Sequence, residues 1–142
     1  YTILDEPVAG LDVVAREQFY KLLLEEYAAT GRTFVISTHI IEEAADVLEE
    51  VIILHEGKIL LVEDTQGLLE RVRYVSGKAE EVDAAVAGLE AHHPEILGRS
   101  KGVTVFLQPG QQVDESRDVS VQMVNLQKAF VALCGEEARH EA

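Results

Sequence analysis

Two adjacent carboxylates, Asp5 and Glu6, follow a short apolar run and precede Pro7. Such a pair suits a division of labour in which one carboxylate holds Mg²⁺, which prefers oxygen ligands, and the other accepts a proton from an attacking water. Because proline disfavours the helical region for the residue before it, we expect Glu6 to be extended and to project beyond the strand. Taken alone, these residues favour a polar strand exit without chemistry.

The elements around these carboxylates read as a parallel crossover. Residues 2–4 are apolar and too few for a helix, which predicts a buried strand. Apolar residues recur at helical spacing over residues 13–29, with Asp12 in front as an N-cap and Gly31 behind as a stop. Residues 33–36 are β-branched and aromatic, and predict a second strand. Strand, helix and strand in this order place the carboxylates at the carboxyl edge of a parallel sheet, where α/β proteins bind ligands.

His39 lies just beyond the second predicted strand. A short acidic helix is expected next, over residues 40–48, followed by a hairpin over residues 51–63 around Glu56, Gly57 and Lys58.

The pattern changes beyond Asp64, and we predict a boundary between a domain of residues 1–73 and a small accessory α/β domain of residues 74–142. The expected order in the second domain is β-α-β-β-α. A helix at 65–71 is expected before the boundary and leads into a strand from 71. The further predicted parts are a helix face at 82–89, a turn-rich stretch at 92–102, strands at 103–107 and 119–123, and a helix at 126–133 stopped by Gly135.

Composition excludes several classes of protein. The 142 residues carry a formal net charge of −14 without a basic stripe, which argues against a nucleic-acid partner. The single cysteine, Cys134, excludes an internal disulfide framework, fits a reducing compartment and is expected in the core. The sequence contains no apolar run of about 18 residues, so we expect no direct membrane insertion.

A second candidate site, formed by His92 and His93, is weaker. Adjacent histidines point in different directions, and no nearby cysteine or paired histidine completes a metal site. We therefore expect a surface turn there.

Residues 3–12, ILDEPVAGLD, resemble the Walker B motif and D-loop of ATP-binding cassette (ABC) ATPases, and STH at residues 37–39 falls where that family carries its switch histidine. The acidic helix and hairpin after the histidine resemble the end of the family's catalytic core. This resemblance covers about residues 1–73 and implies the C-terminal part of a P-loop NTPase core with parallel strands. Val8 and Ala9 depart from the usual pattern, where threonine or another small residue is more common, without removing a functional group.

The resemblance also implies roles for four residues, with ATP and Mg²⁺ as cofactors. Asp5 would orient Mg²⁺, usually through a water, and Glu6 would be the general base. His39 would hydrogen-bond the γ-phosphate and position the attacking water, and Asp12 would line the dimer interface facing the partner's nucleotide. Two alternatives stay open, because Asp12 is also a good N-cap and a histidine after a strand is often only a satisfied polar residue.

In the resembling family, the phosphate loop, the glutamine loop and the signature motif lie upstream of the Walker B motif. The printed sequence contains no G-x-x-x-x-G-K-[ST], so we expect the C-terminal piece of a longer subunit, inactive alone. That subunit would form a homodimer or heterodimer whose ATP-driven closure drives a separate membrane permease of the bacterial exporter type. It would be cytoplasmic and peripheral at the inner face of the cell membrane. The alternatives are a soluble ABC ATPase without a permease, and a non-catalytic regulatory or interaction module.

Overall fold

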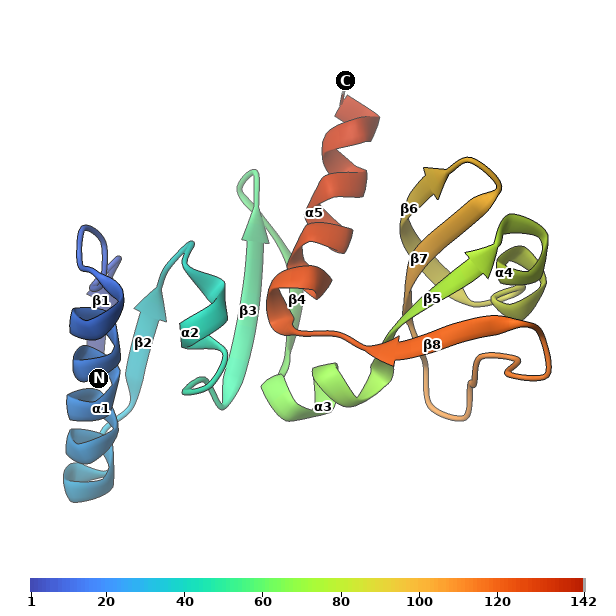
Figure 1. Cartoon of the computed structure of the whole chain (residues 1–142). Coiled ribbons are helices and arrows are strands. Elements are labelled where there is room, and N and C mark those ends of the chain that lie inside the picture. The colour runs from blue at the N-terminus through green and yellow to red at the C-terminus, as the bar shows by residue number, and fades with distance from the viewer. Residues whose placement is uncertain (142) are drawn as a thin grey trace. The chain divides into compact units, whose positions relative to one another are not determined.

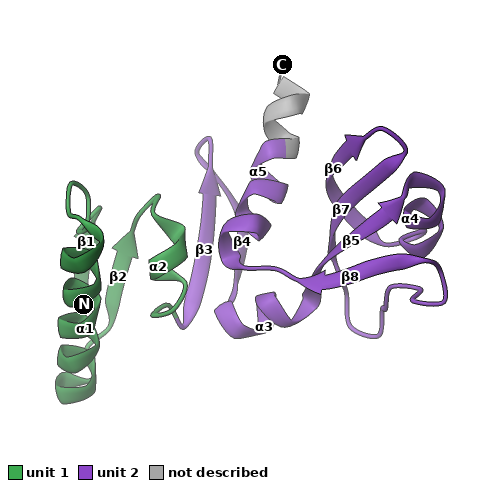
Figure 2. Ribbon diagram, viewed as in Figure 1, with its two compact units in different colours: residues 1–48 green, residues 49–142 purple. Residues whose placement is uncertain are grey.

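The chain forms two compact units, Tyr1–Leu48 and Glu49–Ala142 (Figure 2). A computed structural model describes the backbone of residues 1–141 and the side chains of residues 1–135. Ala142, the last residue of the predicted accessory domain, lies outside the described residues.

The first unit is a strand–helix–strand crossover followed by a single helical turn (Figure 1). Strands β1 and β2 pair in parallel, from Thr2 opposite Phe34 to Asp5 opposite Ser37. The predicted parallel crossover and the α/β fold class are therefore confirmed. The elements are β1 Thr2–Asp5, α1 Val13–Thr30, β2 Phe34–Ser37 and α2 Ile41–Ala44.

Both ends of α1 are capped by the residues that the sequence indicated. The Asp12 side chain accepts a hydrogen bond from the Ala15 N–H at 2.8 Å, which satisfies one of the free amides of the first turn. Gly31 has a φ of 67°, and its N–H donates to the Tyr27 carbonyl at 2.8 Å. Such a left-handed ending is readily accessible to glycine, so α1 stops there.

A small apolar cluster holds the first unit together. Val8, Tyr20 and Ala44 are buried at its centre. Partly buried neighbours surround them: Phe19, Leu23, Ile36, Ile40, Val47 and Leu48. Helix α2 is shorter than the predicted residues 40–48, because the chain turns after Ala44, where the N–H groups of Val47 and Leu48 both donate to the Ala44 carbonyl.

The second unit begins with the predicted hairpin. Strands β3 (Glu50–His55) and β4 (Lys58–Asp64) pair antiparallel, with an irregularity between Ile53 and Leu54. Glu56 and Gly57 connect them with φ values of 51° and 78°. Two successive positive φ angles are typical of a tight two-residue hairpin turn, whose twist matches that of the strands.

A four-stranded antiparallel sheet, in the order β6-β7-β5-β8, forms the rest of the second unit. The remaining elements are α3 Thr65–Arg71, β5 Val72–Lys78, α4 Ala79–Ala85, β6 Glu90–Leu97, β7 Ser100–Phe106, β8 Val119–Met123 and α5 Leu126–Glu141. The predicted boundary at residues 73 and 74 falls inside β5, whereas the compact units divide between Leu48 and Glu49. The domain division, which was based on the change of residue pattern beyond Asp64, stays a prediction.

Two expectations for this sheet were wrong. Residues 92–102, expected as a turn-rich surface stretch, contain most of β6 and the start of β7, so the order is β-α-β-β-β-α. Pairing with β7 makes β6 a strand despite Pro94, which lies where the register shifts between His92 and Glu95. Helix α5 also continues through Gly135 to Glu141, since glycine permits a helix end without enforcing it.

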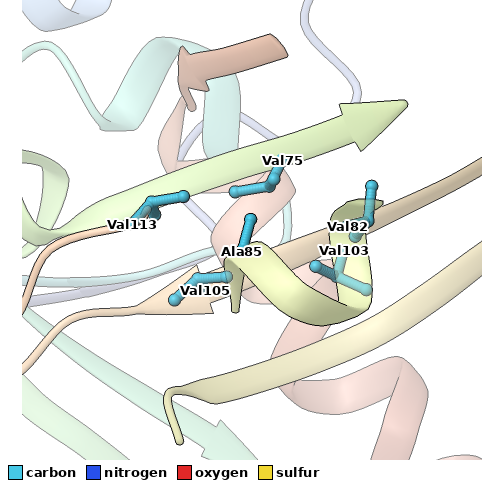
Figure 3. Close-up of a cluster of buried hydrophobic side chains, with 6 residues drawn as sticks. All are labelled: Val75, Val82, Ala85, Val103, Val105 and Val113. Atoms are coloured by element: carbon cyan, nitrogen blue, oxygen red, sulfur yellow. The ribbon is translucent and has the colours of Figure 1, made fainter. Parts of the chain in front are cut away.

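Valine side chains from β5, α4, β7 and the loop before β8 build the core of this sheet. Helix α4 packs on one face, where Val82 and Ala85 meet the strand residues (Figure 3). The buried cluster comprises Val75, Val82, Ala85, Val103, Val105 and Val113. Cys134 is buried on α5, as predicted.

Among the described residues, we find no helix with the length and apolar character needed to cross a membrane.

Candidate functional site

The carboxyl ends of β1 and β2 bring the predicted site residues together. The parallel register places Asp5 opposite Ser37, so the residues that follow each strand emerge at the same edge. The Glu6 N–H extends the pairing by donating to the Ser37 carbonyl at 2.7 Å. As a result, Asp5, Glu6 and His39 lie at one sheet edge.

Glu6 and His39 form a direct contact at this edge. Oε1 of Glu6 lies 2.8 Å from Nδ1 of His39 and accepts a hydrogen bond from the His39 backbone N–H at 3.1 Å. The imidazole is 77% exposed, whereas the Glu6 side chain is 35% exposed. One carboxylate oxygen therefore fixes both the ring and the loop that carries it, and the second ring nitrogen, Nε2, remains for another partner.

The backbone of Glu6 is not extended, contrary to our expectation. Its φ is 47°, and the Ala9 N–H donates to the Glu6 carbonyl at 3.2 Å in a turn that begins directly after β1. The preference of a residue before proline for extended geometry is overridden because the chain must reverse there. A left-handed conformation costs a residue with a Cβ about 1–2 kcal/mol and is typical of functional sites.

Oε2, the second carboxylate oxygen of Glu6, is buried and has no hydrogen-bond partner among the described residues. Buried polar atoms in folded proteins are almost always satisfied by protein, water or an ion. The Glu6 carboxylate is therefore suited to a further partner at this edge.

Asp5 has a partner that the sequence analysis missed. The Ser37 hydroxyl donates to Oδ1 of Asp5 across the parallel pair. The neighbouring Thr38 hydroxyl accepts from the Ile40 N–H at 3.0 Å, which shapes the turn that carries His39. The sequence analysis predicted two parallel strands without a register, and only the register pairs Asp5 with Ser37.

Asp12 lies at the N-terminus of α1 and serves as its cap. None of the hydrogen bonds found in the described part of the chain joins Asp12 to Asp5, Glu6 or His39. The capping alternative for Asp12 is thus realised, and a role at a dimer interface stays a prediction.

Arg16 and Glu43 form a second contact that the sequence did not reveal. The guanidinium binds the carboxylate with two hydrogen bonds, of 2.7 and 3.0 Å, and also donates to the Leu11 carbonyl at 2.8 Å. The hydrogen bond from Arg16 lowers the pKa of Glu43, and the same bond raises the pKa of Arg16. This arginine joins the turn before α1 to α2 and so supports the segment between Glu6 and Asp12.

Tyr20 packs beneath the turn that follows Glu6, in contact with the Val8 cluster. Its hydroxyl is buried and has no hydrogen-bond partner in the described part of the chain. Burial raises the pKa of Tyr20, and the negative charges of Glu43 and Glu6 raise it further. The phenol therefore stays protonated and can donate a hydrogen bond.

This sheet edge suits a Mg²⁺ ion that is shared with substrate phosphates better than one that is held by protein ligands alone. No group of three or more histidine, cysteine or acidic side chains with metal-binding geometry occurs within the described residues. Mg²⁺ usually keeps several waters and binds proteins through one or two carboxylates together with substrate phosphates. Asp5 could supply one such carboxylate, and the unpartnered oxygen of Glu6 leaves that side chain able to accept a further hydrogen bond.

Carboxylates at the carboxyl edge of a parallel strand–helix–strand unit define an α/β ligand-binding edge, and comparisons with known proteins specify the class. No protein-family model matches the chain. The Nod factor export ATP-binding protein I of Rhizobium meliloti is 31% identical over 96% of this chain and 43% of its own length. An energy-coupling factor transporter ATP-binding protein, EcfA2 of Mesoplasma florum, is 38% identical over 41% of this chain and 18% of its own. The aliphatic sulfonates import ATP-binding protein SsuB of Albidiferax ferrireducens is 34% identical over 62% and 29%.

These similarities confirm the predicted resemblance: the chain is similar to part of the ATP-binding subunits of ABC transporters. It spans less than half the length of each of these three relatives.

Proposed function

We propose that the chain supplies the general base, the magnesium-orienting carboxylate and the switch histidine of an ABC transporter ATPase. The observation that carries this proposal is the contact between Glu6 and His39 at the carboxyl edge of β1 and β2. A carboxylate and an imidazole held together at this edge suit the positioning and deprotonation of a water. The buried oxygen Oε2 of Glu6 has no hydrogen-bond partner among the described residues, which a purely structural role of this carboxylate would not explain.

Each residue then has a distinct task. Asp5, oriented by the Ser37 hydroxyl, would hold Mg²⁺, usually through a water. Bound Mg²⁺ neutralises the developing charge on the β- and γ-phosphates of ATP. Glu6 accepts the proton of the attacking water. His39, fixed through Nδ1, directs its other ring nitrogen to the γ-phosphate.

The proposed partners are a second ATPase subunit and a membrane permease. In the dimer, Asp12 would face the nucleotide site of the other subunit while still capping α1. Similarity to a Nod factor export protein over 96% of this chain supports the exporter type, although sulfonate import and energy-coupling relatives match as well. The subunit would be cytoplasmic and reach the membrane only through the permease.

The test uses the longer subunit that contains this chain together with a phosphate loop. Glu6→Gln should abolish ATP turnover and preserve ATP binding, because an amide cannot accept the water's proton but retains the shape of the carboxylate. Glu17→Gln, at an exposed position of α1, is the matched control and should hydrolyse ATP normally. Near-normal turnover by the Glu6→Gln subunit would exclude Glu6 as the base.

The isolated chain should neither bind ATP tightly nor hydrolyse it. The phosphate loop supplies most of the attraction for a triphosphate through its backbone N–H groups and lysine, and the printed sequence contains no such motif. Micromolar ATP binding in a calorimetric titration of this chain would contradict the assignment and favour a different nucleotide site. Copurification of the longer subunit with a polytopic membrane protein would separate the transporter from a soluble ABC ATPase.

A further inference from the structure

Strand β8 lies at one edge of the four-stranded sheet and pairs only with β5 (Figure 1). Its other side therefore presents a row of N–H and C=O groups without a strand partner among the described residues. Folded proteins usually protect such edges with charged side chains, proline or bulges, because an open edge can pair with another chain.

The two edges of this sheet differ in that protection. Strand β6, at the opposite edge, carries Glu90, Pro94 and Glu95, and its register with β7 shifts between His92 and Glu95. Strand β8 reads VSVQM, without charge or proline, and pairs with β5 in an uninterrupted register. In a chain with a net charge of −14, this strand is a neutral edge, and its terminal Met123 is 65% exposed.

An antiparallel register centred on Val121 pairs all five residues of β8 with those of a second copy. A two-fold axis through Val121 places that valine opposite its own copy and Val119 opposite Met123 of the second copy. On the other face of the sheet, Ser120 then lies opposite Gln122 of the second copy. Apolar residues thus meet apolar residues and polar residues meet polar ones, whereas a shift by one residue would exchange the faces of the strand.

The residues that flank β8 also tolerate this register. Asp118, directly before the strand, would face Val124 of the second copy, so the register brings no like charges opposite each other.

Gly77 of β5 approaches the start of β8 closely, and a Cβ there would lie 3.1 Å from the Asp118 carbonyl oxygen. The edge strand is thereby held close to its sheet at the end where pairing would begin.

We propose that β8 is a homodimerisation strand, which pairs antiparallel with β8 of a second copy of this chain and joins the two sheets into one. This contact is independent of ATP and of the proposed catalytic residues. The long-range repulsion between two acidic chains opposes association, so added salt should strengthen the dimer.

Disulfide trapping tests the register in the intact chain, with Cys134→Ala as background. Directly opposite residues in antiparallel strands have Cα atoms about 4.5–5.5 Å apart, within the range of a disulfide. Val121→Cys should therefore form a cross-linked dimer under mild oxidation. Met123→Cys is the control, because its two copies would lie four residues apart along the strands, or about 13 Å, and should not cross-link.

Val121 packs partly against the valine core, so its variant is checked by circular dichroism. If that variant fails to fold, the double variant Val119→Cys and Met123→Cys replaces it. In the proposed register, position 119 of one copy lies opposite position 123 of the second copy, so the two introduced cysteines would meet. Cross-linking of Met123→Cys at the same rate as Val121→Cys, or no cross-linking of the folded Val121→Cys or of the double variant, would overturn the proposal.

Sedimentation equilibrium gives an independent readout. Met123→Lys places a positive charge against the symmetry-related valine and should weaken the association constant by about tenfold or more. Ile96→Lys, at a 71% exposed position on the protected strand β6, should leave the constant unchanged. Equal association of both variants would place self-association on another surface and contradict a β8 dimer.

Discussion

Nδ1 of His39 lies 2.8 Å from Oε1 of Glu6, and the same oxygen accepts the His39 backbone N–H. The glutamate thus determines which ring nitrogen of the histidine remains available. In the proposed ATPase, Nε2 of His39 is that nitrogen and contacts the γ-phosphate. The imidazole of His39 therefore links the general base, Glu6, to the phosphate.

His39 variants should separate the two ring nitrogens in the longer subunit. His39→Asn can keep a polar group near the Nδ1 position and the contact with Glu6, whereas His39→Gln can reach the Nε2 position. Turnover should fall strongly in His39→Ala because positioning is lost, and His39→Gln should retain more activity than His39→Asn. Steady-state ATPase assays with parallel nucleotide-binding measurements check this, and greater activity in His39→Asn would assign the essential contact to Nδ1.

Asp12 variants should distinguish helix capping from an interface role. Asp12→Ala removes the acceptor for the Ala15 N–H and should cost about 1 kcal/mol of stability, whereas Asp12→Asn preserves capping. The measurements are urea unfolding of this chain and ATP turnover of the longer subunit. Normal stability with reduced turnover in Asp12→Asn would support the interface role, and normal values of both would leave capping as its only function.

The ion pair between Arg16 and Glu43 should make the first unit sensitive to acid. The folded-state pKa of Glu43 lies below its ordinary 4.5, so the stabilisation is present above that value and is lost as the pH falls through the folded pKa. Near neutral pH, α1 should be less protected from hydrogen exchange in Glu43→Gln than in the parent chain. Well below pH 4.5, the two chains should show the same protection, because Glu43 is then protonated in the parent chain.

Glu42→Gln is the control for this comparison, because Glu42 is exposed on the same helical turn. It should match the parent chain at every pH. A protection difference for Glu43→Gln that persists unchanged in acid would show that the carboxylate charge is not its source.

Tyr74 lies across Gly102 on the neighbouring strand, where a Cβ would overlap the phenol ring. The Tyr74 hydroxyl donates to Glu95 at 3.0 Å, and the Lys128 ammonium lies 4.1 Å from the ring centroid. Gly102→Ala should therefore destabilise the second unit by about 1–3 kcal/mol, since a packed ring must move.

A double-mutant cycle by urea unfolding tests this relationship. In a Tyr74→Ala background, Gly102→Ala should be nearly neutral, because the ring that it displaces is gone. Gly67→Ala in α3 is the control for the loss of a glycine without a steric clash. A Cβ at position 67 would lie 3.4 Å from Oδ2 of Asp64, which is an ordinary contact distance. Equal costs of Gly102→Ala in both backgrounds would refute the contact.

Local signals predicted the crossover well. Asp12 and Gly31 delimit α1 through capping interactions that depend only on nearby residues, so the helix ends within one residue of the expected position. The carboxyl edge of β1 and β2 followed from the strand–helix–strand order, which brought Glu6 and His39 together.

Features that depend on distant partners were not predictable in the same way. Strand β6 contains Pro94, which is typical of a turn, and only its pairing with β7 makes this segment a strand. The contact between Arg16 and Glu43 spans 27 residues, and nothing local to either residue announces it. For Glu6, the demand of the turn outweighed the local preference set by Pro7.

The left-handed backbone of Glu6 also limits what any substitution at this position can report. β-branched side chains are strongly disfavoured at positive φ, whereas glycine, asparagine and aspartate accept it more readily. Activity lost in a valine or isoleucine variant would therefore combine a missing carboxylate with a distorted turn. Asparagine and glycine variants would keep the turn while removing the acid, so comparing them with glutamine separates the chemistry of position 6 from its part in chain reversal.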